Sequence, residues 1–179
     1  MNICIFLASG QNDLVQLNTV REEFGDTEDA LIEFSRTMND FSQDFMRELW
    51  DEGDNVVFSP FSLHSVLAIL LSGVTPNTKT EKELLNALGG FQNIEGLEQR
   101  YQKMIKNYQT QTILSFGNKL WVTKDRFERL QGRYIERLSG IYDAQLDVLR
   151  DENPAKVINE WVSEITKGKI DKVIGNNLM

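Results

Sequence analysis

Apolar residues recur at every third or fourth position along most of the chain, a spacing that predicts amphipathic helices. The stripes predict one helix from Leu31 to Leu49, one over residues 94–108, one over 126–141, and one that begins at Pro154 and is closed by Gly168. In the last three helices the residues expected to face inward are Leu97, Tyr101, Met104 and Ile105; Phe127, Leu130, Tyr134, Leu138 and Ile141; and Val157, Ile158, Trp161, Val162 and Ile165.

Three other segments have the pattern of strands. The β-branched and aromatic run at residues 56–58 (Val-Val-Phe) predicts a short buried strand. Over residues 110–123 and 144–148, apolar residues alternate with polar or small ones, which predicts one long strand and one half-buried strand. The chain is therefore expected to combine several helices with few strands.

Two further helices are indicated by their starting residues. Ser59-Pro60 combines an N-cap serine with a first-turn proline, and the helix that follows, over residues 61–72, is apolar on nearly every face. Such a helix is expected in the core rather than at the surface. Thr78 and Glu81 form a capping box for the next helix, which is expected to end at Gly89-Gly90.

The N-terminal region is polar and acidic, and residues 1–54 hold 13 acidic and 3 basic residues. We therefore expect residues 1–28 to form an acidic leader and residues 29–179 to form the folded part. The apolar stretch from Ile3 to Ala8 is too short to cross a membrane. It is compatible with the remnant of a secretory signal, although no basic residue precedes it.

The composition is that of a globular protein. The chain has 179 residues, of which 41% are hydrophobic and 26% charged, and this fits one domain or part of a larger one. The formal net charge of −8 argues against nucleic acid as a partner, because phosphate binding needs basic neutralisation. The single cysteine excludes an internal disulfide, and no segment is long and apolar enough to predict a membrane partner.

The sequence offers little for catalysis. His64 is the only histidine, and Ser62 and Ser65 are too near to it along a helix to face it. No nucleophile elbow, phosphate-binding loop, zinc-protease motif or dinucleotide fingerprint is present. We therefore predict no catalytic residues, no metal site and no cofactor, and the protein is not expected to be an enzyme; a serine hydrolase is the weakest alternative.

Arg100, Lys103 and Lys106 lie at helical spacing within residues 94–108 and form a candidate stripe for a sulfated polysaccharide. Glu95 and Glu98 lie in the same helix and dilute the positive charge. An ordinary solvated face is the favoured interpretation, and a glycosaminoglycan partner remains the alternative.

Three motifs follow one another along the chain. They are Asn55-Val56-Val57-Phe58-Ser59-Pro60-Phe61-Ser62 with the later Leu67, Gly73 and Asn77-Thr78; Phe116-Gly117-Asn118-Lys119-Leu120-Trp121-Val122; and Ile158-Asn159-x-Trp161-Val162-x-x-x-Thr166-x-Gly168-Lys169-Ile170. In this order, over about residues 30–175, they resemble the serpin family: they are similar to the serpin strand that enters the second helix, to the second strand of the main sheet, and to the sixth helix. Tyr142-Asp143-Ala144 also fits, whereas Arg150-Asp151 stand where serpins usually have Asp-Phe.

The resemblance implies an α+β fold, with about six serpin-like N-terminal helices and two strands of the main sheet in an incomplete serpin fold. It also implies roles for single residues in the shutter region or in the moving parts of the fold: Asn55, Ser59, Pro60, Ser62, Thr78, Asn159 and Trp161. Each of these residues has a plain structural interpretation as well, as a helix cap, a turn former or a core aromatic.

The resemblance further implies an inhibitor of serine proteases, whose cleaved bait loop inserts into the main sheet as an added strand. Because the resemblance covers only the N-terminal part through the sixth helix, we expect this chain to lack the reactive-centre loop and not to inhibit by itself. A truncated or non-inhibitory serpin-like protein that acts by binding alone is the alternative. We expect secretion, with a cytoplasmic location as the alternative, and an isolated chain that is prone to oligomerise or aggregate through unpaired strand edges.

Overall fold

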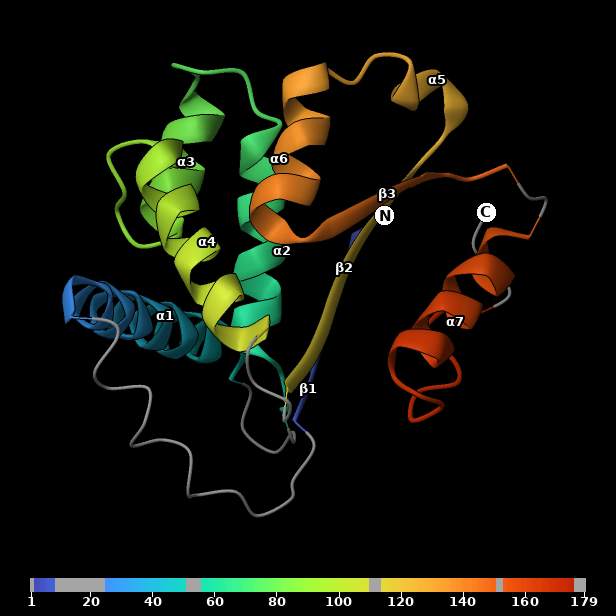
Figure 1. Cartoon of the computed structure of the whole chain (residues 1–179), viewed down its shortest axis with the longest axis horizontal. Coiled ribbons are helices and arrows are strands. Elements are labelled where there is room, and N and C mark those ends of the chain that lie inside the picture. The colour runs from blue at the N-terminus through green and yellow to red at the C-terminus, as the bar shows by residue number, and fades with distance from the viewer. Residues whose placement is uncertain (1, 9–24, 51–55, 110–113, 151–152, 176–179) are drawn as a thin grey trace. The chain divides into compact units, whose positions relative to one another are not determined.

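The computed structural model describes residues 2–8, 25–50, 56–109, 114–150 and 153–175 (Figure 1). The chain divides into two compact units. Residues 10–111 form one, here called the helical unit, and residues 1–9 and 112–179 form the other, here called the sheet unit. Among the described helices, none is both long enough and apolar enough to cross a membrane.

The helical unit contains α1 (Gly25–Leu49), α2 (Pro60–Ser72), α3 (Lys79–Ala87) and α4 (Ile94–Gln109). Helix α1 packs against α2 and α4, and α2 also contacts α3. The residues predicted to face inward from α4 are all buried, at 0–6% exposure: Leu97, Tyr101, Met104 and Ile105. The 3.6-residue period of the sequence therefore identified this face correctly.

The predicted caps form. The Ser59 hydroxyl accepts a hydrogen bond from the Ser62 amide at 3.2 Å, and Pro60 is the first residue of α2. The Thr78 hydroxyl accepts from the Glu81 amide at 3.3 Å. The Glu81 carboxylate reaches back to the Asn77 amide at 2.6 Å, one residue beyond the position expected for a capping box.

The predicted buried strand at residues 56–58 does not form, and the side chain of Val57 is 97% exposed. The segment stays without regular structure because no described strand lies beside it to satisfy its backbone groups. Phe58 alone is anchored, with its ring 5.2 Å from that of Phe45. Helix α2 is likewise less enclosed than its composition predicts, since Leu70 is 47% exposed.

Among the described residues of the sheet unit, three strands lie in the order β1-β2-β3: β1 (Asn2–Ala8), β2 (Leu114–Val122) and β3 (Ala144–Val148). Strand β1 runs antiparallel to β2, and β3 runs parallel to it. The strands predicted over residues 110–123 and 144–148 are confirmed. Strand β1 lies within the segment that we expected to be a leader, and the proposed division at residue 28 stays a prediction.

The predicted single helix over residues 126–141 is wrong. The structure has the short α5 (Lys124–Phe127) and a separate α6 (Gly132–Tyr142). The chain turns between them, with the Leu130 amide donating to the Phe127 carbonyl at 3.1 Å, and Gln131 takes the extended conformation of an N-cap. Glycine at the next position favours this break because it is a poor helix former. The last predicted helix is confirmed as α7 (Pro154–Ile165), capped by Asn153.

His64 lies at the centre of the helical unit and is fully buried. Its Nε2–H donates to the Leu88 carbonyl at 3.0 Å, so Nδ1 is the acceptor for the Tyr101 hydroxyl. The rings of Phe34 and Phe41 meet the imidazole edge-on, with centroids 5.8 and 5.0 Å away. The histidine thus joins α1, α2, α4 and the residue that follows α3, which is a structural role.

Burial lowers the pKa of His64 from 6.5 to about 4, although its bond to the Leu88 carbonyl opposes the shift. The unfolded chain therefore binds a proton more readily than the folded chain below pH 6.5. Stability supported by the neutral imidazole is complete above that pH and is lost as the pH falls towards 4. At about 1.4 kcal/mol per pH unit, the full loss is roughly 3 kcal/mol.

We expect the free energy of unfolding to fall more steeply between pH 7 and pH 5 in the wild type than in His64→Gln, whose amide does not titrate. Urea titrations at each pH measure this difference, and carboxylates contribute equally to both proteins. Because the chain has one histidine, its imidazole NMR signal is unambiguous. An imidazole that titrates near pH 6.5 in the folded protein contradicts the prediction.

Candidate functional site

Helix α7 covers one face of the sheet at β2. Trp121 of β2 forms a buried cluster with Ile158 and Val162 of α7, at exposures of 1%, 1% and 0%. The Trp161 ring stands edge-on to that of Trp121, with centroids 5.2 Å apart at 84°. The predicted core role of Trp161 therefore fits the structure, with Trp121 as its partner.

Gly117 allows α7 to approach β2 closely. A Cβ atom at this position would lie 3.0 Å from Cγ1 of Ile165 and 3.4 Å from the Trp161 ring. The first distance is tighter than ordinary van der Waals contact, so any larger residue would push the helix away from the strand. The glycine of the second motif therefore has a packing reason.

Asn159 connects α7 to the chain that follows it. Its side-chain Oδ1 accepts from the amides of Val173 and Ile174, at 2.9 and 3.0 Å, and its Nδ2 donates to the Ile174 carbonyl at 2.9 Å. The Thr166 hydroxyl accepts from the Ile170 amide at 3.0 Å. These bonds fold residues 170–174 back along α7, so Ile170 and Ile174 can pack against the Trp121 cluster.

Asn118 has a similar role on the other side of β2, and the sequence argument did not assign it one. Its Nδ2 donates to the Tyr142 carbonyl at 3.1 Å, at the end of α6. Asp143 follows with φ 48°, in the left-handed region, and turns the chain into β3. A signal was available, because asparagine is disfavoured in a strand and its presence within Phe116–Val122 needed a reason.

An ion pair joins β2 to β3. The Lys119 ammonium lies 3.2 Å from the Asp147 carboxylate of β3 and 5.4 Å from the centroid of the Trp121 ring. The Lys119 side chain is 14% exposed, whereas that of Asp147 is 53% exposed, so water still screens one side of the pair and its contribution is modest. The ion pair therefore supports the parallel pairing of β2 with β3.

The residues predicted for the shutter region and the moving parts of the fold are divided between the two units. Asn55 lies outside the described residues. Ser59, Pro60 and Ser62 begin α2, and Thr78 begins α3, all in the helical unit, whereas Asn159 and Trp161 belong to the sheet unit. The structure gives each described residue a local role as a cap or a packing group. Their roles in a moving shutter stay predictions.

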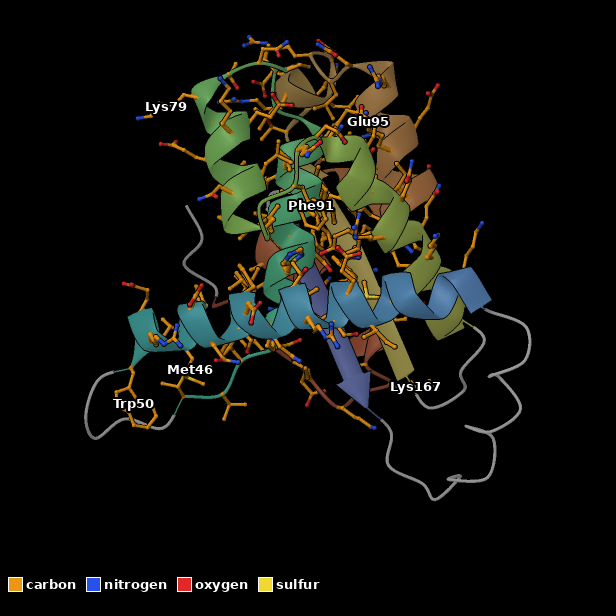
Figure 2. The ribbon with its side chains drawn as sticks, turned by 90° about the vertical axis from the view of Figure 1, so that its left-hand side faces the viewer. Met46, Trp50, Lys79, Phe91, Glu95 and Lys167 are labelled. Atoms are coloured by element: carbon orange, nitrogen blue, oxygen red, sulfur yellow. The ribbon has the colours of Figure 1, made fainter. Side chains whose placement is uncertain are left out.

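The three basic residues on α4 differ in surroundings. The Arg100 guanidinium donates to the Gly96 carbonyl and to Glu33, both at 3.1 Å. It also lies 5.1 Å from the centroid of the ring of Phe91, a residue that is labelled in Figure 2. Lys103 and Lys106 are exposed. Arg100 is thus a structural residue of the helical unit, and the other two cations face solvent one turn apart.

Substituting Gly117 with valine is expected to destabilise the protein by roughly 2 kcal/mol, as overpacking does, by displacing Ile165 and Trp161. Urea unfolding measures the loss, and the near-ultraviolet circular dichroism of the tryptophan pair is expected to weaken. Gly140→Ala is the control, because a Cβ there meets nothing within 4 Å. Equal stability of Gly117→Val and wild type contradicts this account of α7 packing.

Comparison with known proteins identifies the architecture. Residues 36–179 match the family model described as serpin (serine protease inhibitor). The leukocyte elastase inhibitor of Sus scrofa is 31% identical over 148 residues, which are 78% of this chain but 38% of that protein.

Solved structures agree at the level of the fold. Native protease nexin-1 with heparin superposes with a TM-score of 0.65 at 22% identity, over 84% of this chain and 41% of that one. An Arabidopsis serpin in its native stressed conformation gives 0.62 at 20% identity, over 83% and 39%. The expected α+β, incomplete serpin fold is confirmed, and the chain spans about 40% of the length of these relatives. On the family match and the similarity of fold, this chain belongs to the serpin family.

Proposed function

We propose that this chain is the N-terminal part of a serpin-type inhibitor of serine endopeptidases and does not inhibit a protease by itself. The family match over residues 36–179 carries the proposal, together with the name of the 31% identical relative, an elastase inhibitor. Members of this family are inhibitors and not catalysts, so we propose that the protein is not an enzyme. The buried His64, with both ring nitrogens hydrogen-bonded, supports this, since its imidazole is engaged in the core and not presented to a substrate.

In the proposed inhibitor, the serine of the protease attacks the scissile carbonyl of a bait loop. The peptide C–N bond breaks, the amine of the next residue leaves with a proton, and the new C-terminal carbonyl remains linked to the serine as an acyl ester. The cleaved loop then adds to the main sheet as a strand and gains main-chain hydrogen bonds. The part of the inhibitor represented here would supply β2, β3 and the helix that covers them. The bait loop and the strands that receive it would lie in the remainder of the family fold.

Two features of the structure are compatible with a sheet that opens to receive an added strand. Helix α7 lies on the sheet through a small apolar cluster, and Asn159 ties the segment of residues 173–174 to the helix, so the sheet can rearrange if the apolar contact opens. Ser59 and Ser62 contribute small hydroxyls at the start of α2. We propose that these positions, with Asn55, Pro60 and Thr78, serve the shutter of the complete protein.

The test compares this chain with the longest natural polypeptide that contains it. We expect the 179-residue chain, in excess over trypsin, chymotrypsin or elastase, to leave proteolytic activity unchanged and to form no complex that survives denaturing electrophoresis. An antibody against residues 94–110 is expected to detect an endogenous band far heavier than 20.6 kDa. That heavier product is expected to form a covalent complex with one of these proteases.

An endogenous band at 20.6 kDa would contradict the proposal and favour the alternative, a short serpin-like protein that acts by binding alone. A covalent complex formed by the 179-residue chain itself would overturn the claim that it lacks inhibitory activity. We propose secretion, the setting in which a protease inhibitor meets extracellular proteases, and a cytoplasmic location remains the alternative.

A second candidate function is binding of a sulfated polysaccharide by α4. The observations that favour it are the exposure of Lys103 and Lys106 on one face of α4 and the heparin in the solved structure of protease nexin-1. Glu95 is also exposed on this helix, and the whole chain is acidic, so we propose weak binding that is sensitive to salt.

We expect the double variant Lys103→Ala/Lys106→Ala to elute from immobilised heparin at lower salt and to show a salt slope shallower by roughly one to two. The matched control is Lys79→Ala/Lys82→Ala, which removes the same charge from exposed positions on α3. Equal elution of the two double variants would show that only net charge matters and would exclude a site on α4.

A further inference from the structure

The hydrogen-bond and ring partners of the His64 imidazole are all uncharged. Its two hydrogen bonds join it to the Leu88 carbonyl and the Tyr101 hydroxyl, and its ring contacts are with Phe34, Phe41 and Tyr101. None of these described partners is a carboxylate. A proton on the ring would therefore place a buried charge within the packing of α1, α2 and α4, with no opposite charge in contact.

The bond to Tyr101 also depends on the protonation state of the ring. In the neutral ring Nδ1 accepts the hydroxyl hydrogen, because Nε2–H is the group that donates to the Leu88 carbonyl. In the imidazolium ion both nitrogens carry hydrogen, so both can only donate. Nδ1–H would then point at the hydroxyl, and the tyrosine would have to turn its own hydrogen away. Protonation therefore breaks the present hydrogen bond from α4 to α2 as well as charging the core.

The charged residues on the surrounding helices lie mostly at the surface. Helix α2 has none, those of α1 within residues 31–49 are exposed, and those of α3 are exposed except for the half-buried Glu81. On α4, Arg100 is paired with Glu33 at 3.1 Å, whereas Glu98 is buried, at 6% exposure. Glu98 is therefore the carboxyl group whose titration has to be separated from that of His64.

The sheet unit has a core of its own and contains no histidine. Trp121, Ile158 and Val162 are buried together there, and His64 is the single histidine of the chain. Histidine is the side chain whose ordinary pKa lies between pH 5 and pH 8, whereas exposed carboxylates titrate near pH 4. Acidification from pH 7 to pH 5 is therefore expected to act chiefly on the helical unit.

We propose that His64 is a pH-dependent switch for the helical unit: uptake of one proton by its imidazole opens the packing of α1 and α4 on α2 while the sheet unit stays folded. The closed unit resists the charge, whereas an opened unit lets water solvate it, so acid shifts the equilibrium towards the open form. Opening exposes the aromatic residues around the ring, Phe34 and Tyr101 among them. The proposal goes beyond a loss of global stability, and it does not depend on protease inhibition.

The size of the effect follows from the two states of the imidazole. The pKa of His64 is about 4 in the closed unit, against the ordinary 6.5 once water reaches the ring. The neutral ring thus supports the closed form fully above pH 6.5, and this support is lost as the pH falls towards 4. For one proton, the equilibrium constant for opening is expected to rise about twentyfold between pH 7 and pH 5.

The test is amide hydrogen exchange of the 179-residue chain at pH 7, 6 and 5, with rates corrected for the pH dependence of unprotected amides. The opening constants of α2 and α4 amides are expected to rise about twentyfold, and those of β2 and α7 amides to change less than about twofold. In His64→Gln, whose amide does not titrate, the rise in α2 and α4 is expected to disappear. In the matched variant Glu98→Gln the rise is expected to remain.

The wild-type measurement alone can overturn the proposal. Equal rises in the two units would show that acid opens the whole chain at once, and constant opening in α2 and α4 would show that no proton is taken up there. Neither result needs a variant that folds. A rise of the same size in His64→Gln would assign the proton to another group, and loss of the rise in Glu98→Gln would assign it to that carboxyl.

Discussion

The parallel pairing of β2 with β3 is the constraint on which the sheet unit depends. Parallel neighbours cannot be joined by a tight turn, so the chain must leave the end of β2 and return to the level where it began. Helices α5 and α6 make this return, and the Asn118 amide holds the last carbonyl of α6 beside β2. The left-handed backbone conformation of Asp143 then turns the chain from α6 directly into β3.

The helix that follows is a consequence of the same pairing. Without α7, the face formed by β2 and β3 would leave the Trp121 ring in contact with water. Helix α7 covers this ring with Ile158 and Val162. Gly117 sets how closely the helix can lie. The helical unit is organised differently, around one neutral imidazole with two hydrogen bonds and aromatic neighbours.

Much of this was predictable from the sequence wherever one local rule decides the outcome. The caps at Ser59, Thr78 and Asn153 and the buried face of α4 follow from spacing and side-chain chemistry alone. The failures occur where the outcome depends on a partner. Residues 56–58 have strand composition without a neighbouring strand, and β1 could be recognised only through its register with β2.

The contacts of the candidate site were less predictable for the same reason. The motifs named Asn159 and Trp161, but not that the first would bind residues 173–174 or that the second would meet Trp121. Such pairings join positions far apart in the chain, and no periodicity encodes them. For Asn118, the sequence offered one signal of a structural role, because asparagine is unusual in a strand, but it did not indicate the bond to the Tyr142 carbonyl.

The bonds of Asn159 have a consequence for the timescales on which the molecule opens. The amides of Val173 and Ile174 lie outside every helix and strand, yet both are held by one side-chain oxygen of α7. Their exchange with deuterated solvent is therefore governed by a single event, the release of this segment from the helix. The exchange rate of these two adjacent amides therefore reports how often the segment separates from α7, independently of the global unfolding of the chain.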